Sequence, residues 1–171
     1  IIIVDSFQSG LNDPIASILK VITKDTKDKK TGKKVLILGR YNFNKPENLN
    51  ELSNKFKRLN IEYMTIHKSK GLQADNIIIL SLETAKYGFP GSIDNDPIMN
   101  LVRPEEDTFE HAEERRLFYV ALTRTKEKAY LIKPLNPSPF LTEISSYPEV
   151  SNIGDHQMDL SCSECEDGTF I

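Results

Sequence analysis

Cysteine is scarce in this 171-residue chain, and tryptophan is absent. The two cysteines, Cys162 and Cys165, both lie near the C-terminus, which argues against a fold built on disulfides. No apolar run approaches the roughly 18 residues that a membrane-spanning helix needs, and no secretory signal peptide is recognisable. We therefore expect a cytoplasmic protein with no membrane partner.

An excess of charge of one sign is also missing. The chain carries 22 Lys+Arg against 25 Asp+Glu, for a formal net charge of -3. No global basic field is available to attract nucleic acid, so any such binding requires a local patch. The composition, 39% hydrophobic and 27% charged, fits one globular domain with a real core. Because the chain starts on an apolar run with no methionine, we interpret it as a fragment.

A complete phosphate-binding loop of the pattern G-x-x-x-x-G-K-[ST] is absent as well. Thr31, Gly32 and Lys33 resemble its end. However, Lys27 stands at the position of the first glycine and Lys34 at that of the hydroxyl residue. We expect this lysine-rich segment to be a solvated loop.

Apolar periodicity alternates between strand and helix patterns along most of the chain, which predicts a mostly parallel α/β sheet. The expected strands are residues 1–4, 35–38, 61–66, 76–82 and 128–133, and the expected helices are residues 14–22, 46–59, 108–126 and 140–145. A long loop of residues 83–107 precedes the third helix. We assign residues 1–148 to the domain and residues 149–171 to a polar tail, where apolar periodicity stops.

The stretch Glu113–Arg124 combines an apolar helical stripe with several charges. Two glutamates stand near the expected N-terminus of the helix, where the helix dipole favours negative charge. Arg124 lies near the other end, where a long cation could reach beyond its own domain. A guanidinium suits phosphate because its planar fork makes bidentate hydrogen bonds and stays charged. An amphipathic core helix with ion-paired arginines explains the same pattern equally well.

A second polar stretch, Thr65–Asp75, lies between two expected strands. Thr65, His67 and Lys70 offer a hydroxyl, an imidazole and a cation at the end of a strand, and Gly71 permits a tight reversal. Such groups suit contacts with phosphates and sugars. A polar crossover loop is the alternative. No second histidine or cysteine lies near His67 in sequence, which disfavours a metal site there.

Together these stretches resemble the UvrD/Rep-type superfamily 1 DNA helicases. Residues 65–75 are similar to motif V of that family, and residues 113–124 to motif VI. Residues 35–42 resemble the strand-arginine element ahead of motif V, and residues 137–141 the segment after motif VI. The glutamine-alanine-aspartate run that begins at Gln73 resembles the DNA helicase IV branch. The motifs occur in the family's order, and the resemblance covers residues 35–141.

The resemblance implies a RecA-like, P-loop NTPase-type fold, in which ATP with Mg²⁺ sits between two lobes. This chain would be the second lobe, domain 2A, which lacks a Walker A sequence of its own. Arg124 would be the catalytic arginine finger that reaches the γ-phosphate, and Gly71 and Gln73 would lie near the ribose and phosphates. Many relatives have glutamate in place of Gln73; the amide still accepts a hydrogen bond but carries no charge.

The same resemblance implies that Thr65, His67 and Lys70 contact the backbone of single-stranded or forked DNA, with Arg40 in support. The expected partner within the protein is an N-terminal RecA-like lobe, and the expected activity of the whole is ATP-dependent DNA unwinding and translocation. Because no phosphate-binding loop is present, we expect the chain alone to hydrolyse no ATP.

Two alternative functions stay open. The same lobes could drive remodelling of RNA polymerase instead of unwinding, or the chain could be an α/β binding module with no ATPase partner. Cys162 and Cys165 form a single C-x-x-C pair, whereas a zinc ribbon uses two such pairs. They are either half of a ribbon or two free thiols.

Overall fold

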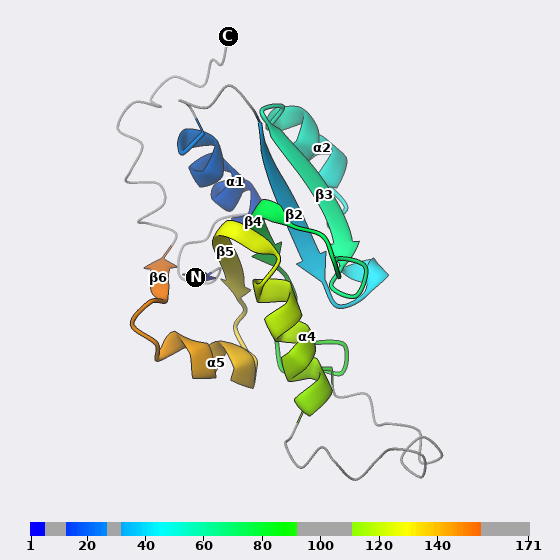
Figure 1. Ribbon diagram of the computed structural model, residues 1–171, viewed down its shortest axis with the longest axis vertical. Coiled ribbons are helices and arrows are strands. Elements are labelled where there is room, and N and C mark those ends of the chain that lie inside the picture. The colour runs from blue at the N-terminus through cyan, green and yellow to red at the C-terminus, as the bar shows by residue number, and fades with distance from the viewer. Residues whose placement is uncertain (6–12, 27–31, 92–110, 155–171) are drawn as a thin grey trace.

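The computed structural model describes residues 1–5, 13–26, 32–91 and 111–154 (Figure 1). Its sheet has six strands in the order β3-β2-β4-β5-β1-β6, and every neighbouring pair is parallel. The α/β fold that the sequence predicted is therefore confirmed. The strands are β1 (Ile2–Asp5), β2 (Lys33–Gly39), β3 (Leu59–Thr65), β4 (Ala74–Ile79), β5 (Thr125–Lys133) and β6 (Ser151–Gly154). The helices are α1 (Pro14–Lys24), the 3-10 helix η1 (Asn42–Asn44), α2 (Leu49–Lys55), α4 (Ala112–Leu122) and α5 (Pro139–Ser145).

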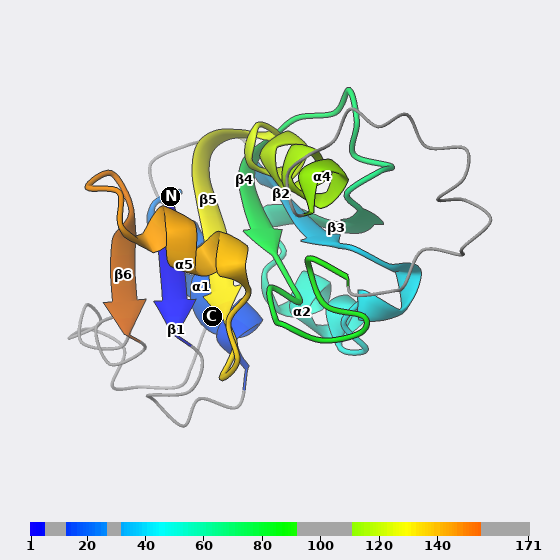
Figure 2. The same cartoon turned by 90° about the horizontal axis from the view of Figure 1, so that it is seen from below.

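Both faces of the sheet are covered, as the continuous aliphatic runs predicted. Side chains alternate along β2, so that Val35 and Ile37 join one apolar cluster while Leu36 and Leu38 join the other. All four are fully buried. The first cluster packs beneath α1 and α2, and the second beneath α4 and α5 (Figure 2). The sheet is thus the middle of three layers.

Helix α1 begins where the sequence indicated. The Asp13 carboxylate accepts hydrogen bonds from the backbone N–H groups of Ile15 and Ala16, at 2.9 and 3.1 Å. Pro14 occupies the first turn, where its missing N–H costs nothing. None of the helices in the described ranges has the length and hydropathy needed to cross a membrane.

Helix α2 is shorter than predicted. The expected helix over residues 46–59 ends at Lys55, and Leu59 instead begins β3, opposite Lys33 of β2. Phe56 and Leu59 are still buried. The apolar spacing therefore continued through a turn, and pairing with β2 ended the helix.

Helix α4 is also shorter than predicted. Of the expected range 108–126, residues 108–110 lie outside the described part, and the helix ends at Leu122. Thr125 opens β5, three residues earlier than expected, because it pairs with Ala74 of β4. Arg124 consequently lies in the turn between α4 and β5.

The boundary at residue 148 was wrong as a limit of the folded domain. Residues 151–154 form β6, which pairs in parallel with β1 from Ile2↔Ser151 to Asp5↔Gly154. Backbone hydrogen bonds form this strand, and they need no apolar pattern. Residues 155–171 of the expected tail lie outside the described residues, as do residues 92–107 of the long loop.

Candidate nucleotide and nucleic-acid interface

The turn after α4 holds the Arg124 side chain against neutral acceptors. Its Nε–H donates to the carbonyl of Val120 at 2.9 Å, and Nη2 donates to the hydroxyl of Thr123 at 3.0 Å. Nη1 reaches the carbonyl of Leu72 at 3.3 Å. In the described ranges no carboxylate lies within ion-pair distance of this guanidinium. Arg124 is thus positioned, but its charge is not compensated by those residues.

The crossover from β3 to β4, residues 66–73, is a run of turns rather than a regular element. The buried Ser69 donates its backbone N–H to Thr65 O at 3.1 Å and its hydroxyl to Ile66 O at 2.7 Å. Gly71 has φ +85°, and a Cβ built there would meet no atom within 4 Å. Backbone conformation, not crowding, therefore requires glycine at this position.

The end of the crossover meets the turn after α4. The backbone N–H of Ala74 donates to the carbonyl of Arg124 at 3.0 Å. The contact between Arg124 and Leu72 lies one residue earlier along the crossover. Gly71 and Gln73, both exposed, flank Leu72. We call Gly71, Gln73 and Arg124 the Arg124 cluster. It lies at the amino ends of β4 and β5, and the fold thus brings together the three residues that the sequence analysis assigned to the nucleotide.

A second cluster lies at the carboxyl end of β2. Arg40 grips the carboxylate of Glu114, in the first turn of α4, through Nη2–Oε1 at 2.7 Å and Nε–Oε1 at 3.0 Å. The side chains are 22% and 15% exposed. Nη1 of Arg40 lies 3.4 Å from Nδ1 of His67. We call these three residues the Arg40 cluster.

Sequence reasoning missed the role of Glu114. The helix dipole is the only reason that the sequence gives for Glu114 itself, and the folded chain reveals its specific partner, Arg40, 74 residues away. Motif spacing does not encode such a pair.

The remaining predicted nucleic-acid residues have different environments. Thr65 is buried, and its hydroxyl accepts the backbone N–H of Lys68 at 3.4 Å, so part of its observed role is to shape the crossover. Lys70 is exposed, and its backbone N–H donates to His67 O at 3.3 Å. Lys70 therefore shares a turn with His67.

Metal ligands do not gather in the described part of the chain: no group of three or more His, Cys, Asp or Glu side chains there is arranged to hold an ion. Cys162 and Cys165 lie outside the described residues.

Comparison with known proteins identifies the family. The family model for the UvrD-like helicase C-terminal domain matches residues 12–135. DNA helicase IV of Escherichia coli (strain K12) is 41% identical over 113 residues, which are 66% of this chain and 16% of that protein. The putative ATP-dependent DNA helicase YjcD of Bacillus subtilis (strain 168) is 40% identical over 76 residues, or 44% of this chain and 9% of the relative.

A third relative extends the comparison. The ATP-dependent DNA helicase PcrA of Staphylococcus aureus (strain COL) is 30% identical over 95 residues, 49% of this chain and 12% of that protein. The chain thus aligns with less than one fifth of each of these relatives. The matched range contains both clusters, and the chain belongs to the UvrD-like helicase C-terminal domain family.

Proposed function

We propose that this chain is the second RecA-like lobe of an ATP-driven DNA helicase, and that it supplies Arg124 to ATP held by a neighbouring lobe. The names of the relatives, ATP-dependent DNA helicases and DNA helicase IV, agree with this proposal. The family's place in larger proteins agrees as well, because the aligned residues make up only 16% of DNA helicase IV.

One observation carries the proposal: Arg124 is held by neutral acceptors beside Leu72 and has no carboxylate partner in the described ranges. A cation fixed before the reaction stabilises charge that develops during phosphoryl transfer. The donor set of the Arg124 cluster fits a nucleotide, because it adds the open space at Gly71 and an exposed amide at Gln73. ATP supplies the phosphoryl group. Arg124 would neutralise its γ-phosphate, and Gln73 would accept from the ribose hydroxyl.

Mg²⁺ and the water-positioning groups would come from the neighbouring lobe. The described residues offer no cluster of carboxylates for the ion. This division of labour matches the missing phosphate-binding loop in the sequence.

Thr65, His67 and Lys70 would contact the DNA backbone, with Arg40 in support. His67 and Lys70 are exposed in one turn, and Arg40 lies beside His67. Phosphate contacts of this kind position a strand without reading its sequence. The crossover runs from these residues to the Arg124 cluster. A displacement at the DNA-contacting residues would therefore shift the Arg124 cluster, and a translocating motor needs such coupling between its two ligands.

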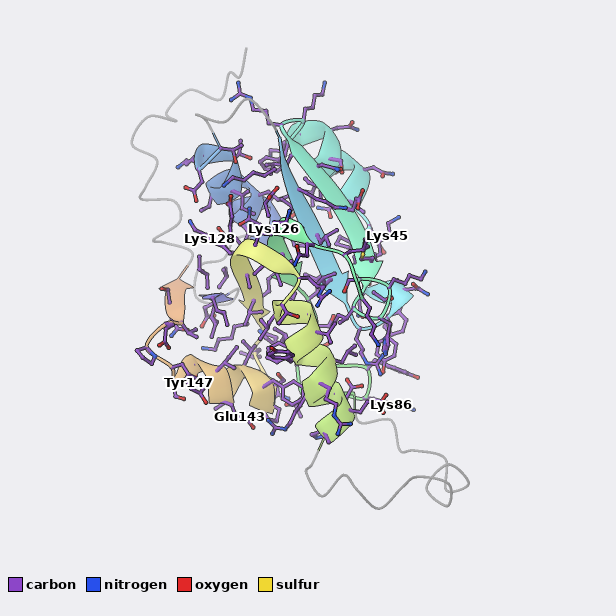
Figure 3. The ribbon with its side chains drawn as sticks, viewed as in Figure 1. Lys45, Lys86, Lys126, Lys128, Glu143 and Tyr147 are labelled. Atoms are coloured by element: carbon purple, nitrogen blue, oxygen red, sulfur yellow. The ribbon has the colours of Figure 1, made fainter. Side chains whose placement is uncertain are left out.

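The test replaces Arg124 in the full-length protein. With Arg124→Ala we expect DNA-stimulated ATP turnover to fall by roughly 10³-fold or more, as for other arginine fingers, while ATP binding stays within about threefold of wild type. Lys126→Ala is the matched control, since Lys126 is an exposed cation at the start of β5 (Figure 3). It should change neither quantity.

Wild-type turnover in Arg124→Ala would contradict the proposed role of Arg124. ATP turnover that DNA does not stimulate would instead favour the alternative, an ATPase that remodels RNA polymerase.

A further inference from the structure

An exposed group of aromatic rings, used by none of the roles above, lies beyond the carboxyl end of β2. The rings of Tyr41 and Phe43 stack at 5.0 Å with an interplanar angle of 9°. Tyr87 stands edge-on to both, at 6.0 and 5.7 Å. Phe43 is 66% exposed and Tyr87 50%. We call these three residues the aromatic platform. Single exposed apolar side chains are ordinary, whereas contiguous ones mark interaction sites.

The platform is fixed before any ligand arrives. The backbone N–H of Tyr41 donates to the side-chain carbonyl of Asn44 at 2.8 Å, within η1. The hydroxyl of Tyr63 donates a hydrogen bond to the carbonyl of Tyr41. Burial raises the pKa of this hydroxyl, so it stays protonated as a donor. At Gly91 a Cβ would lie 2.9 Å from the Tyr41 hydroxyl, so the missing side chain there leaves room for the ring. Binding would therefore cost little ordering of Tyr41.

Cations border the rings. Cζ of Arg40 lies 5.1 Å from the centroid of Tyr41, and Nζ of Lys86 lies 5.6 Å from that of Tyr87. Lys45, directly after η1, is exposed on the same side of the molecule as Lys86 (Figure 3). In the described ranges neither lysine has a carboxylate within 4 Å, whereas Arg40 shares its charge with Glu114. The positive charge left for a ligand belongs to Lys45 and Lys86.

Flat rings bordered by cations match the chemistry of an unpaired nucleotide in a strand. Bases stack on aromatic faces without regard to sequence, and cations meet the phosphates between them. The platform also adjoins Arg40, which lies beside His67. A strand whose backbone met His67 would bring its bases close to Phe43 and Tyr87.

We propose that the aromatic platform stacks an unpaired base of single-stranded DNA, with Lys45 and Lys86 facing the adjacent phosphates. This proposal rests on the proposed function and adds to it a base-binding site. A free nucleotide carries the same base chemistry, and a protein segment could also cover exposed rings, so the test separates these occupants.

The test compares two oligonucleotides of equal length, oligothymidine and its abasic counterpart, bound to the full-length protein at one salt concentration. Fluorescence anisotropy gives the affinities. Phe43→Ala and Tyr87→Ala should each weaken binding of oligothymidine by roughly 5- to 100-fold, the contribution of one stacked base. Binding of the abasic strand should change by less than about twofold, since phosphate contacts remain. Phe43→Trp should keep the wild-type affinity for oligothymidine, because the indole ring can stack on a base as the phenyl ring does.

Tyr147→Ala is the matched control. Tyr147 is 61% exposed and lies after α5, on the other side of the molecule from Lys86 (Figure 3). It should leave both affinities unchanged.

Three outcomes would overturn the platform alone: unchanged affinity for oligothymidine, an equal loss for both strands, or weaker ATP binding with DNA binding intact. The last would assign the rings to a free nucleotide, and unchanged affinity would leave them to a protein segment. A wild-type protein that bound no single-stranded DNA would overturn the proposed function as well.

Discussion

Arg40 and Arg124 are the same residue type, but their side chains have different kinds of hydrogen-bond acceptor. Both guanidiniums are held by several hydrogen bonds, but Arg40 meets the carboxylate of Glu114, whereas Arg124 meets two backbone carbonyls and a hydroxyl. A carboxylate neutralises the charge that it binds, and neutral acceptors only orient it. The charge of Arg124 is therefore not compensated by the described residues, whereas Arg40 joins two elements.

Tyr130 gives a prediction at the scale of one hydroxyl. Its ring is fully buried, and its hydroxyl has no hydrogen-bond partner among the described atoms. Removing such a group by Tyr130→Phe should raise the free energy of unfolding by about 1 kcal/mol at pH 7. Urea unfolding of the chain measures this change in stability. Tyr119→Phe is the control, because Tyr119 is 68% exposed. A stability lower than wild type would contradict the expectation.

The same variant has a signature in alkali. Burial raises the pKa of the Tyr130 hydroxyl above its ordinary value of 10.0, and the negative charges of Asp25 and Glu127 raise it further. Because the folded state holds this proton more tightly than the unfolded state does, titration of this hydroxyl leaves the stability of the fold unchanged well below pH 10 and lowers it as pH rises above that value. Tyr130→Phe should therefore lose less stability than wild type between about pH 9.5 and pH 11.

At the scale of elements, local patterns predicted the strands and helices whose apolar residues are buried in the two clusters on either side of the sheet. The stripe of α1 and the aliphatic run of β2 needed no information from elsewhere in the chain. The ends of α2 and α4 were predicted too late, because strand pairing ended both helices. The polar strand β6 was missed, since its backbone pairs with β1 and its side chains give no signal.

The sequence motifs nominated several candidate residues, but they gave neither the role of Glu114 nor the arrangement of the residues. The motifs named Arg40, His67, Gly71, Gln73 and Arg124, yet their division into two clusters depends on the crossover and the turn after α4. The aromatic platform had no sequence signal at all. Tyr87 is 44 residues from Phe43 in the numbering and meets it only in the folded chain.

The ion pair between Arg40, directly after β2, and Glu114 of α4 links these two elements. A double-mutant cycle on the two residues measures its contribution to stability. Their bidentate contact is mostly buried, with side-chain exposures of 22% and 15%. We expect a coupling free energy of about 1–3 kcal/mol in urea unfolding of the chain. Arg115 and Glu143 form the matched pair, because they join α4 to α5 but are 41% and 49% exposed. Their coupling should be below about 1 kcal/mol. Equal couplings would show that burial does not decide the difference.

At the scale of the whole molecule, two segments connect the two clusters. The crossover of residues 66–73 starts beside Arg40 and ends beside Arg124. Helix α4 runs the same way, with Glu114 in its first turn and Arg124 just after its end. Both segments pack on the same face of the sheet, through Ile66, Phe118 and Ala121 (Figure 2). A close-packed layer transmits displacement rather than absorbing it. A displacement of the Arg40 cluster should therefore also displace the Arg124 cluster.

The proposed division of the motor between two lobes gives the last prediction, which concerns the chain by itself. It offers Arg124 but no phosphate-binding loop, and an arginine finger without bound and positioned ATP has nothing to accelerate. Purified chain should therefore hydrolyse ATP no faster than the Arg124→Ala chain prepared in the same way, with or without single-stranded DNA. The paired preparation matters because contaminating ATPases would appear in both samples and cancel. A turnover that scales with the concentration of wild-type chain and disappears in Arg124→Ala would mean that this chain binds and cleaves ATP unaided.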